Sequence, residues 1–145
     1  MTDLAAHPIV FYDGVCGLCD RSVQFILRHD TARRFRFAAL QSDFAGEILD
    51  RQGRDRRDLD TMYVVLDAGT PTEHLLAKSD AVLAVLHDLG WRRLAAVAHA
   101  VPRALRDRGY EFVARHRYRW FGRYEQCALP PPDVRERFVD LVARA

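Results

Sequence analysis

The feature that most limits the fold of this chain is a pair of cysteines three positions apart, Cys16 and Cys19, directly after an apolar run. Residues 9–12, Ile-Val-Phe-Tyr, are β-branched or aromatic and predict a strand buried on both faces. From Cys16 onward, apolar side chains recur at helical spacing to about His29, and polar residues fall largely on the other side. The cysteine pair is therefore expected where a buried strand turns into an amphipathic helix.

Alternating strand and helix patterns continue along the chain as far as Gly90. Ser42 and Gly53 bracket the second helix as N-cap and C-terminal stop, and Ser79 caps the third. The order βαβαββα has a crossover helix between its first two strands and a tight turn between its last two. It predicts a thioredoxin-like mixed four-stranded sheet of the α/β class. The expected strands are residues 9–12, 35–40, 62–66 and 73–77, and the expected helices lie within residues 16–29, 42–53 and 79–90.

Residues 91–145 are expected to form a helical C-terminal extension packed on the same core. Pro102 can begin a helix there, and the prolines at residues 130–132 end the helical pattern. The sequence shows no linker, low-complexity segment or internal repeat. We therefore expect a single domain over residues 1–145, with its core at about 8–90.

Composition excludes several classes of protein. The chain is 49% hydrophobic and 29% charged, as in soluble globular proteins, and its formal net charge is only +2. No apolar run approaches the roughly 18 residues of a membrane span, and the first residues lack the features of a secretory signal. The small net charge gives no reason to expect nucleic acid or a membrane as a partner. A cytoplasmic location is expected, where three cysteines do not form a disulfide scaffold.

The cysteine pair has the spacing of a redox dithiol. Cys16 and Cys19 share one side of the expected first helical turn, close enough to form a disulfide with little backbone movement. Unpaired N–H groups and the helix dipole favour a thiolate at Cys16, and the thiolate is the attacking form of cysteine. Cys19 is expected one turn deeper and more shielded, as suits a resolving thiol. This chemistry requires no cofactor and no metal.

Two other interpretations of the pair stay open. The thiols can be structural or incidental, or they can bind zinc together with Cys127 and a histidine such as His116 or His29. The sequence contains no second Cys-x-x-Cys and no paired histidines at metal-binding spacing. The zinc interpretation is therefore the weaker one.

Asp13 stands three residues before Cys16 and has two interpretations of its own. It can accept or relay the proton of Cys19, or orient the loop by accepting hydrogen bonds from N–H groups near Cys16. Alternatively, it only forms an Asx turn that ends the strand, because Asp-Gly is itself a turn dipeptide.

Four further residues lie near the pair in the sequence. Gly14 is expected to supply a positive φ, and Gly17 the room for close approach of a substrate chain. Arg21 is near enough to help hold a thiolate, although it and Asp20 also suit an exposed first helical turn.

The sequence resembles the DCC family of predicted thiol-disulfide oxidoreductases, named for an aspartate and two cysteines. In this chain these are Asp13, Cys16 and Cys19, within YDGVCGLC. The resemblance covers nearly the whole chain and implies a thioredoxin-like fold and a dithiol-disulfide activity. It includes LQS at residues 40–42, KSDA at 78–81 and RYRWFGRYEQCALP at 117–130.

One departure from thioredoxin itself stands out. Thioredoxins present a cis-proline just before the third strand, beside the active cysteines. Residues 61–62 hold Thr-Met at this place, with no proline nearby. We therefore expect the substrate-docking edge to differ.

The C-terminal third carries an arginine-rich stretch. Residues 103–123 contain seven arginines and two acidic residues, a local charge of +5, with Tyr118 and Trp120 among them. A solvated helix face with buried aromatics is one interpretation, an anionic-substrate or acidic-partner surface is another, and nucleic acid is a weak third. Cys127, just beyond, can be a buried small residue, a third redox partner or a metal ligand.

The sequence thus predicts a thiol-disulfide oxidoreductase of the protein-disulfide reductase type that acts through Cys16 and Cys19 with the help of Asp13. Its expected partners are a disulfide-containing protein or small molecule and an electron donor that the sequence does not identify. The alternative is a non-catalytic binding module, in which the cysteines hold zinc or are idle and the basic C-terminal third docks a partner. The oligomeric state has no signal in the sequence.

Overall fold

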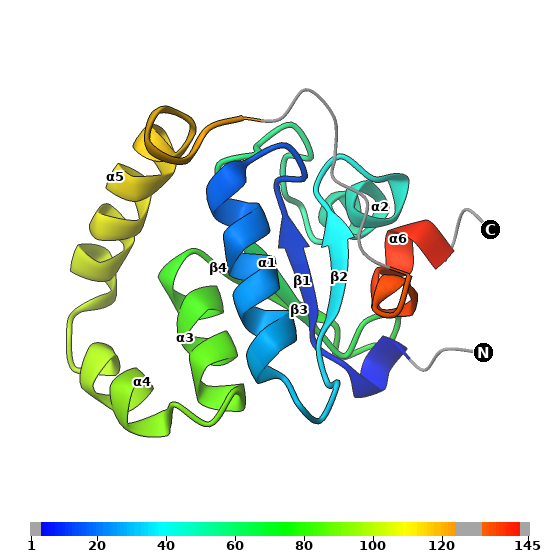
Figure 1. Ribbon diagram of the computed structural model, residues 1–145, viewed down its shortest axis with the longest axis horizontal. Helices are drawn as coiled ribbons and strands as arrows, with labels where there is room; N and C mark the ends of the chain where they lie inside the picture. Colours follow the sequence, from blue (N-terminus) through cyan, green and yellow to red (C-terminus); the bar gives the residue numbers. More distant parts are fainter. Residues whose placement is uncertain (1–3, 124–131, 143–145) are drawn as a thin grey trace.

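The computed structural model describes residues 4–123 and 132–142 and has a mixed four-stranded sheet at its centre (Figure 1). The spatial order is β2-β1-β3-β4, in which β1 runs parallel to β2 and antiparallel to β3, while β4 runs antiparallel to β3. The thioredoxin-like sheet expected from the sequence is confirmed. Its strands are β1 (Ile9–Tyr12), β2 (Arg36–Ala39), β3 (Tyr63–Leu66) and β4 (His74–Ala77).

Helices cover both faces of the sheet. In β1 the side chain of Val10 packs on the face that carries α1 and α3, whereas Ile9 and Phe11 pack on the face that carries α2 and α6. All three side chains are buried, which is why this strand reads as a continuous apolar run rather than an alternating one. The helices are α1 (Gly17–His29), α2 (Asp43–Arg51), α3 (Ser79–Asp88) and α6 (Val139–Val142). Two 3₁₀ helices are also present: η1 (Leu4–Ala6) lies before β1, and η2 (Arg135–Arg137) lies before α6.

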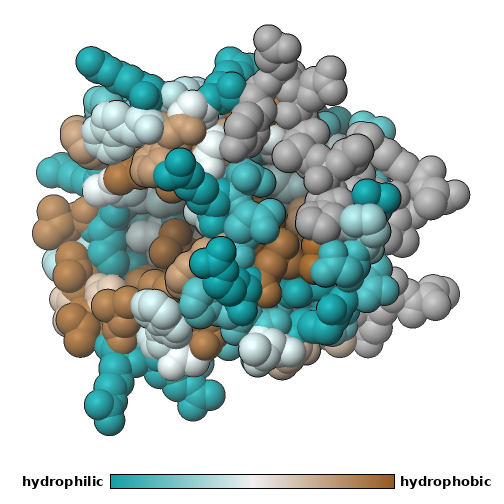
Figure 2. Space-filling view, in the orientation of Figure 1, coloured by the Kyte–Doolittle hydropathy of each residue, from teal (hydrophilic) through white to brown (hydrophobic). Residues whose placement is uncertain are grey.

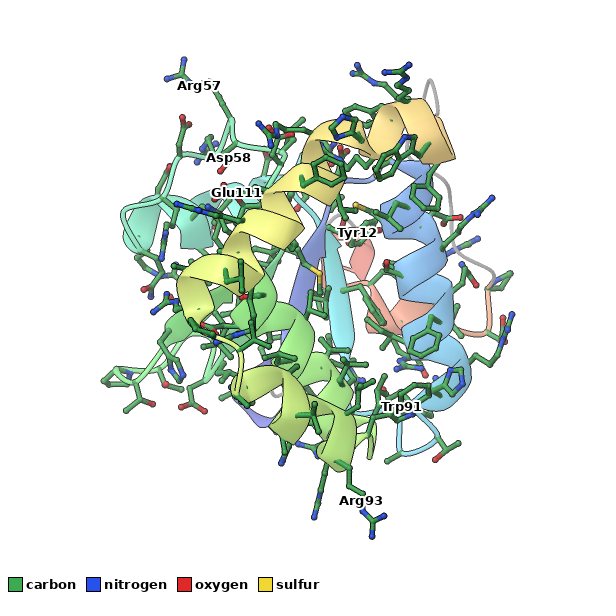
Figure 3. All side chains as sticks on the ribbon, turned by 90° about the vertical axis from the view of Figure 1, so that its left-hand side faces the viewer. Tyr12, Arg57, Asp58, Trp91, Arg93 and Glu111 are labelled. Carbon is green, nitrogen blue, oxygen red and sulfur yellow. The ribbon has the colours of Figure 1, made fainter. Side chains whose placement is uncertain are left out.

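The helical extension lies on two sides of the molecule. Helices α4 (Arg92–His99) and α5 (Arg103–Phe121) pack outside α1 and α3, and the end of α5 lies beside the start of α1 (Figure 1). Trp91, just before α4, lies beside the C-terminal end of α1 and packs edge-on against Phe25 (Figure 3). Residues 135–142 instead lie next to β2, where Phe138 forms a β-bridge with Phe37.

Large hydrophobic side chains remain exposed on α4 and α5, on the left-hand side of the view in Figure 2. We call this set the outer apolar face. Its members are Trp91, Leu94, Val97, Val101, Leu105, Phe112, Val113 and Trp120.

One expected helix cap is wrong. Lys78, with φ +55°, occupies the N-cap position of α3, and Ser79 is the first residue of the helix. The hydroxyl of Ser79 donates instead to the carboxylate of Asp107 on α5. The serine thus links two helices, a contact that local capping rules do not anticipate. No helix in the described part of the chain is both long and apolar enough to cross a membrane.

Candidate active site

The cysteine pair lies where β1 gives way to α1. Cys16 is the N-cap residue of α1, with extended backbone, and its N–H donates to the carbonyl of Asp13 at 3.2 Å. The N–H of Cys19 donates to the Sγ atom of Cys16 at 3.4 Å. The sulfur of Cys16 therefore occupies the place of the side-chain oxygen that ordinarily caps a helix. Both cysteines are free thiols.

The surroundings push the pKa values of the two thiols apart. The pKa of Cys16 falls to about 6, chiefly because the Cys19 thiol donates a hydrogen bond to its sulfur. Burial opposes this fall, whereas the N–H groups of Cys19 and Leu18 and the charge of Arg117 assist it. The pKa of Cys19 rises because of its hydrogen bond to Cys16, burial and the Cys16 charge. At neutral pH the pair therefore consists of a thiolate at Cys16 and a thiol at Cys19.

The exposure of the two thiols is the reverse of the expectation. Cys16 has no exposed surface, whereas Cys19 is half-buried and lines a cavity. The prediction that Cys19 is the more shielded thiol is therefore wrong. It relied on position along the helix alone and took no account of chain that returns to the helix start.

That returning chain is residues 121–123, which we call the strap. Arg123 forms an antiparallel β-bridge with Cys16, and the carbonyl of Gly122 accepts from the N–H of Gly17 at 3.1 Å. A Cβ atom on Gly17 would lie only 2.1 Å from the carbonyl oxygen of Phe121. Gly17 does permit a close backbone approach, but by this chain's own strap.

The carboxylate of Asp13 is buried beside the pair and accepts hydrogen bonds at both oxygens. Oδ1 accepts from the side-chain amide of Gln41 at 2.6 Å and from the N–H of Val15 at 3.1 Å. Oδ2 accepts from Arg117 at 3.1 Å and from the hydroxyl of Tyr118. The Val15 contact joins the carboxylate to the N–H two residues on, so it fits both the loop-orienting bond and the Asx turn expected of this aspartate. The other partners come from two distant parts of the chain, Gln41 after β2 and Arg117 and Tyr118 on α5.

These contacts keep Asp13 ionised. Burial raises the pKa of Asp13, but the hydrogen bonds from Tyr118, Gln41, Val15 and Arg117 together leave it below the usual value. The negative charge of Asp13 in turn contributes to the raised pKa of Cys19. A carboxylate of low pKa is a weak proton acceptor, so the geometry favours an electrostatic influence on Cys19.

Gly14 lies in the same loop without the positive φ that was expected, since it is not among the described residues with φ above zero. Its N–H donates to the side-chain oxygen of Gln41 at 3.0 Å. The loop is therefore shaped by Gln41, which bonds to both Gly14 and Asp13.

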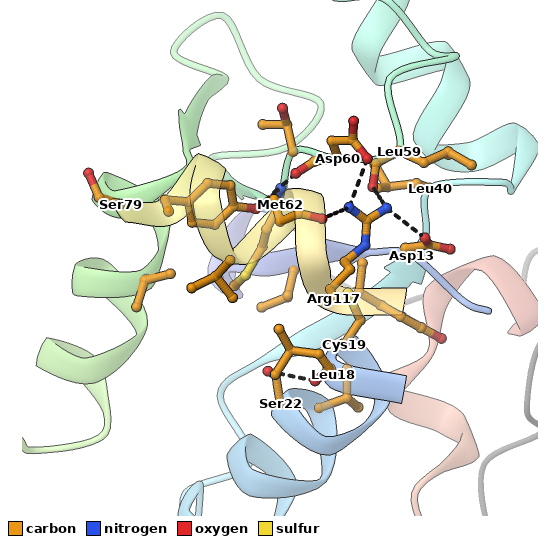
Figure 4. Close-up of a pocket in the computed structure, with 18 of the residues that line it drawn as sticks. Asp13, Leu18, Cys19, Ser22, Leu40, Leu59, Asp60, Met62, Ser79 and Arg117 are labelled. Atoms are coloured by element: carbon orange, nitrogen blue, oxygen red, sulfur yellow. Dashed lines mark hydrogen bonds and ion pairs between the residues drawn. The ribbon is translucent and has the colours of Figure 1, made fainter. Parts of the chain in front are cut away.

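Arg117 on α5 is the residue that the sequence interpretation missed. Its side chain is buried and forms ion pairs with Asp13 at 3.1 Å and Asp60 at 2.7 Å, while it donates to the carbonyl of Leu59 at 3.0 Å (Figure 4). Its Nε–H is buried and has no acceptor among the described residues. A signal was available, because Arg117 shares helical spacing with the half-buried Tyr110 and Ala114.

Five of the other six arginines in the arginine-rich stretch are exposed, whereas Arg106 is half-buried. Arg115 and Arg119 point to solvent, but Trp120 is 51% exposed, so the expectation of buried aromatics is wrong there. Its ring stacks on His116, which in turn packs on Phe112.

Other residues singled out from the sequence lie farther from the dithiol. Arg21 lies over the ring of Phe121 at 5.4 Å and so contacts the strap rather than a sulfur. His29 packs on Phe25, and the described residues contain no cluster of three or more His, Cys, Asp or Glu that could hold a metal ion. Cys127 lies outside the described residues.

The residues that lead into β3 contact helix α5. The described residues contain no cis peptide bond, and the N–H of Met62 donates to the hydroxyl of Tyr110 at 2.7 Å. The N–H of Met62 just before β3 is therefore already hydrogen-bonded to a residue of α5.

Comparison with known proteins identifies one matching family and two similar proteins. The model of the DCC1-like thiol-disulfide oxidoreductase family matches residues 10–123. The chain is 36% identical to the uncharacterized protein YuxK of Bacillus subtilis over 92% of this chain and 94% of that protein. It is 39% identical to a chloroplastic DCC family protein of Arabidopsis thaliana over 85% of this chain and 70% of that protein. No solved structure matches the chain.

Proposed function

The chain belongs to the DCC1-like thiol-disulfide oxidoreductase family, and from this premise we propose that it reduces or exchanges disulfides through Cys16 and Cys19. The observation that carries the proposal is the hydrogen-bonded pair at the helix start, with a thiolate at Cys16 and a thiol at Cys19. Such a pair combines a nucleophile with a proton-bearing second thiol.

The reaction begins at Cys16. Its thiolate attacks one sulfur of the substrate disulfide, the substrate S–S bond breaks, and the departing thiolate takes a proton from solvent. A mixed disulfide between Cys16 and the substrate remains. Because Cys16 has no exposed surface, this step requires the strap to move away from the helix start.

Resolution then falls to Cys19. In the mixed disulfide, Cys16 no longer carries the charge that helps to raise the pKa of Cys19. Cys19 loses its proton to solvent and attacks the sulfur of Cys16, releasing the second substrate thiolate. The products are two substrate thiols and a Cys16–Cys19 disulfide, so two electrons have passed to the substrate. A dithiol reductant from a reducing compartment such as the cytoplasm restores the pair.

The experiment that tests this function compares Cys16→Ser with Cys19→Ser in a disulfide reduction assay. We expect Cys16→Ser to be inactive, and Cys19→Ser to attack once and accumulate mixed disulfides that mass spectrometry detects. Full activity of Cys16→Ser, or stoichiometric zinc on the purified wild-type protein, would contradict the proposal.

We assign Asp13 to the same machinery through its charge. The substitution Asp13→Asn, made in a Cys16→Ser background, removes the negative charge beside Cys19 and should lower the pH midpoint of Cys19 alkylation. The expected shift is about one pH unit. Glu47→Gln, on the exposed side of α2, is the control and should leave the midpoint unchanged. An unchanged midpoint in Asp13→Asn would remove this aspartate from the site.

A further inference from the structure

A cavity of about 460 Å³ opens beside the dithiol (Figure 4). It is bounded by α1, α3, α5, the sheet and the loop that leads into β3. Its volume falls within the roughly 300–1,000 Å³ of small-molecule sites. Cys19 lines this cavity and Cys16 does not.

The cavity has a predominantly apolar lining. The side chains that make it so include Leu18, Val23, Ile26, Met62, Val82 and Val113.

Most polar side chains of the lining hydrogen-bond within the protein, and the buried Nε–H of Arg117 is an exception among the described residues. The hydroxyl of Ser22 donates to the carbonyl of Leu18 at 2.9 Å, and the hydroxyl of Tyr110 donates to the carbonyl of Asp60 at 3.3 Å. A peptide inserted here would leave its own N–H and C=O groups without partners. The cavity therefore suits a small molecule better than a stretch of chain.

The charges of the lining are paired as well. Arg117 is neutralised by Asp13 and Asp60, and Arg106 forms an ion pair with Asp80 at 3.1 Å. A charged ligand group would have to compete with these pairs in a mostly apolar space. An uncharged ligand meets no such penalty.

We propose that this cavity binds the uncharged apolar group attached to the disulfide of a small-molecule substrate, an inference that rests on the proposed function. A group held there places the adjoining disulfide against Cys19, next to the Cys16 thiolate that attacks it. The electron balance is that of the reaction above: the S–S bond of the small molecule is reduced to two thiols as the Cys16–Cys19 disulfide forms.

The first test measures binding alone. The probe is N-phenyl-1-naphthylamine, an uncharged apolar fluorophore, titrated into the full-length protein. Fluorescence should rise and saturate at one probe per chain. Ala114→Phe fills the cavity from α5 and should weaken binding about tenfold or more, and Val82→Phe does so from α3. Ala104→Phe is the matched control, because it adds the same ring to α5 at an exposed position outside the lining.

The second test measures substrate preference. The ratio of kcat/KM for dibenzyl disulfide to that for bis(2-hydroxyethyl) disulfide should be about tenfold or more in wild type and in Ala104→Phe. This ratio should fall toward one in both cavity-filling variants, with thermal melts confirming that each is folded.

The outcomes separate the two proposals. If both disulfides are reduced equally well by the wild type, the cavity assignment is overturned while the proposed function stands. Equal weakening of probe binding by Ala104→Phe and Ala114→Phe also overturns it. If neither small disulfide is reduced but a protein disulfide is, the cavity assignment is overturned while the proposed function stands, and if no disulfide of either kind is reduced, both fail.

Discussion

At the scale of single residues, Asp13 and Arg117 form a buried ion pair beside the dithiol. Both side chains are almost inaccessible, and they lie 104 positions apart in the sequence. A buried ion pair adds little net stability, but removing one partner leaves the other charge uncompensated. The pair therefore makes the start of α1 dependent on α5.

The substitution Arg117→Met tests this dependence. It should lower the free energy of unfolding by about 3–5 kcal/mol, because the Asp13 carboxylate would stay buried without its cation. It should also raise the pKa of Cys16, which the charge of Arg117 helps to lower. Urea denaturation and pH-dependent alkylation measure the two effects. Arg119→Met, an exposed neighbour on α5, should change neither. A mutant as stable as wild type would contradict the argument.

A second prediction concerns the contact between the thiols. The hydrogen bond from Cys19 is the largest cause of the lowered pKa of Cys16. Cys19→Ala should therefore raise the midpoint of Cys16 alkylation from about 6 by one pH unit or more, whereas Cys19→Ser, which still offers a donor, should raise it less. Equal midpoints in wild type and Cys19→Ala would show that the helix start alone lowers the pKa.

At the scale of elements, the strap determines whether Cys16 can be reached. It is held by a β-bridge and a backbone hydrogen bond, and Gly122 adopts φ +85°, a conformation that favours glycine. Among the described residues, the packing of Arg21 over Phe121 and of Arg123 over Tyr118 adds to these contacts, and opening so short a segment should cost much less than unfolding of the sheet.

Gly17→Ala should displace the strap, because the added Cβ would lie 2.1 Å from the carbonyl oxygen of Phe121. Alkylation of Cys16, located by peptide mass spectrometry, should become about tenfold faster, which corresponds to about 1.4 kcal/mol of lost strap stability. Gly109→Ala is the control: it adds the same methyl group to α5 where, apart from the adjoining backbone of that helix, no atom lies within 4 Å. The control should leave the rate unchanged. A rate in Gly17→Ala equal to wild type would show that the strap does not limit access.

Local sequence patterns predicted the elements well and their distant contacts poorly. The strand at residues 9–12 has the predicted bounds, and the helix after it ends at His29 as expected. Both predictions use only the apolar pattern of residues close together in the sequence. The strap and the role of Arg117 depend on residues about a hundred positions away. No periodicity specifies such contacts. The position of the dithiol at the helix start could therefore be predicted from the sequence, but the strap that buries Cys16 could not.

At the scale of the whole molecule, the lowered pKa of Cys16 links stability to pH. The folded-state value of about 6 lies below the ordinary value of 9.0, so the unfolded chain binds more protons between these values. The reduced protein should therefore gain stability as pH rises from 6 to 8 and lose it as pH falls through 6.

The measurement is the melting temperature of the reduced form minus that of the oxidised form, followed from pH 6 to 8. This difference should increase with pH, because the groups common to both forms largely cancel. In Cys16→Ser, with and without reductant, the difference should stay flat. A difference that decreases with rising pH in the wild type would contradict the sign of the shift.

The strap also has a consequence during synthesis of the chain. The sheet and α1 to α3 are complete once residue 90 has emerged, whereas Arg123, which bridges to Cys16, follows 33 residues later. At ribosomal rates of about 5–20 residues per second, the nascent protein spends on the order of seconds with its helix start uncovered. During that interval the thiolate would meet oxidants and other nascent thiols without its cover. Prompt translation of α5 therefore protects the dithiol before the protein has left the ribosome.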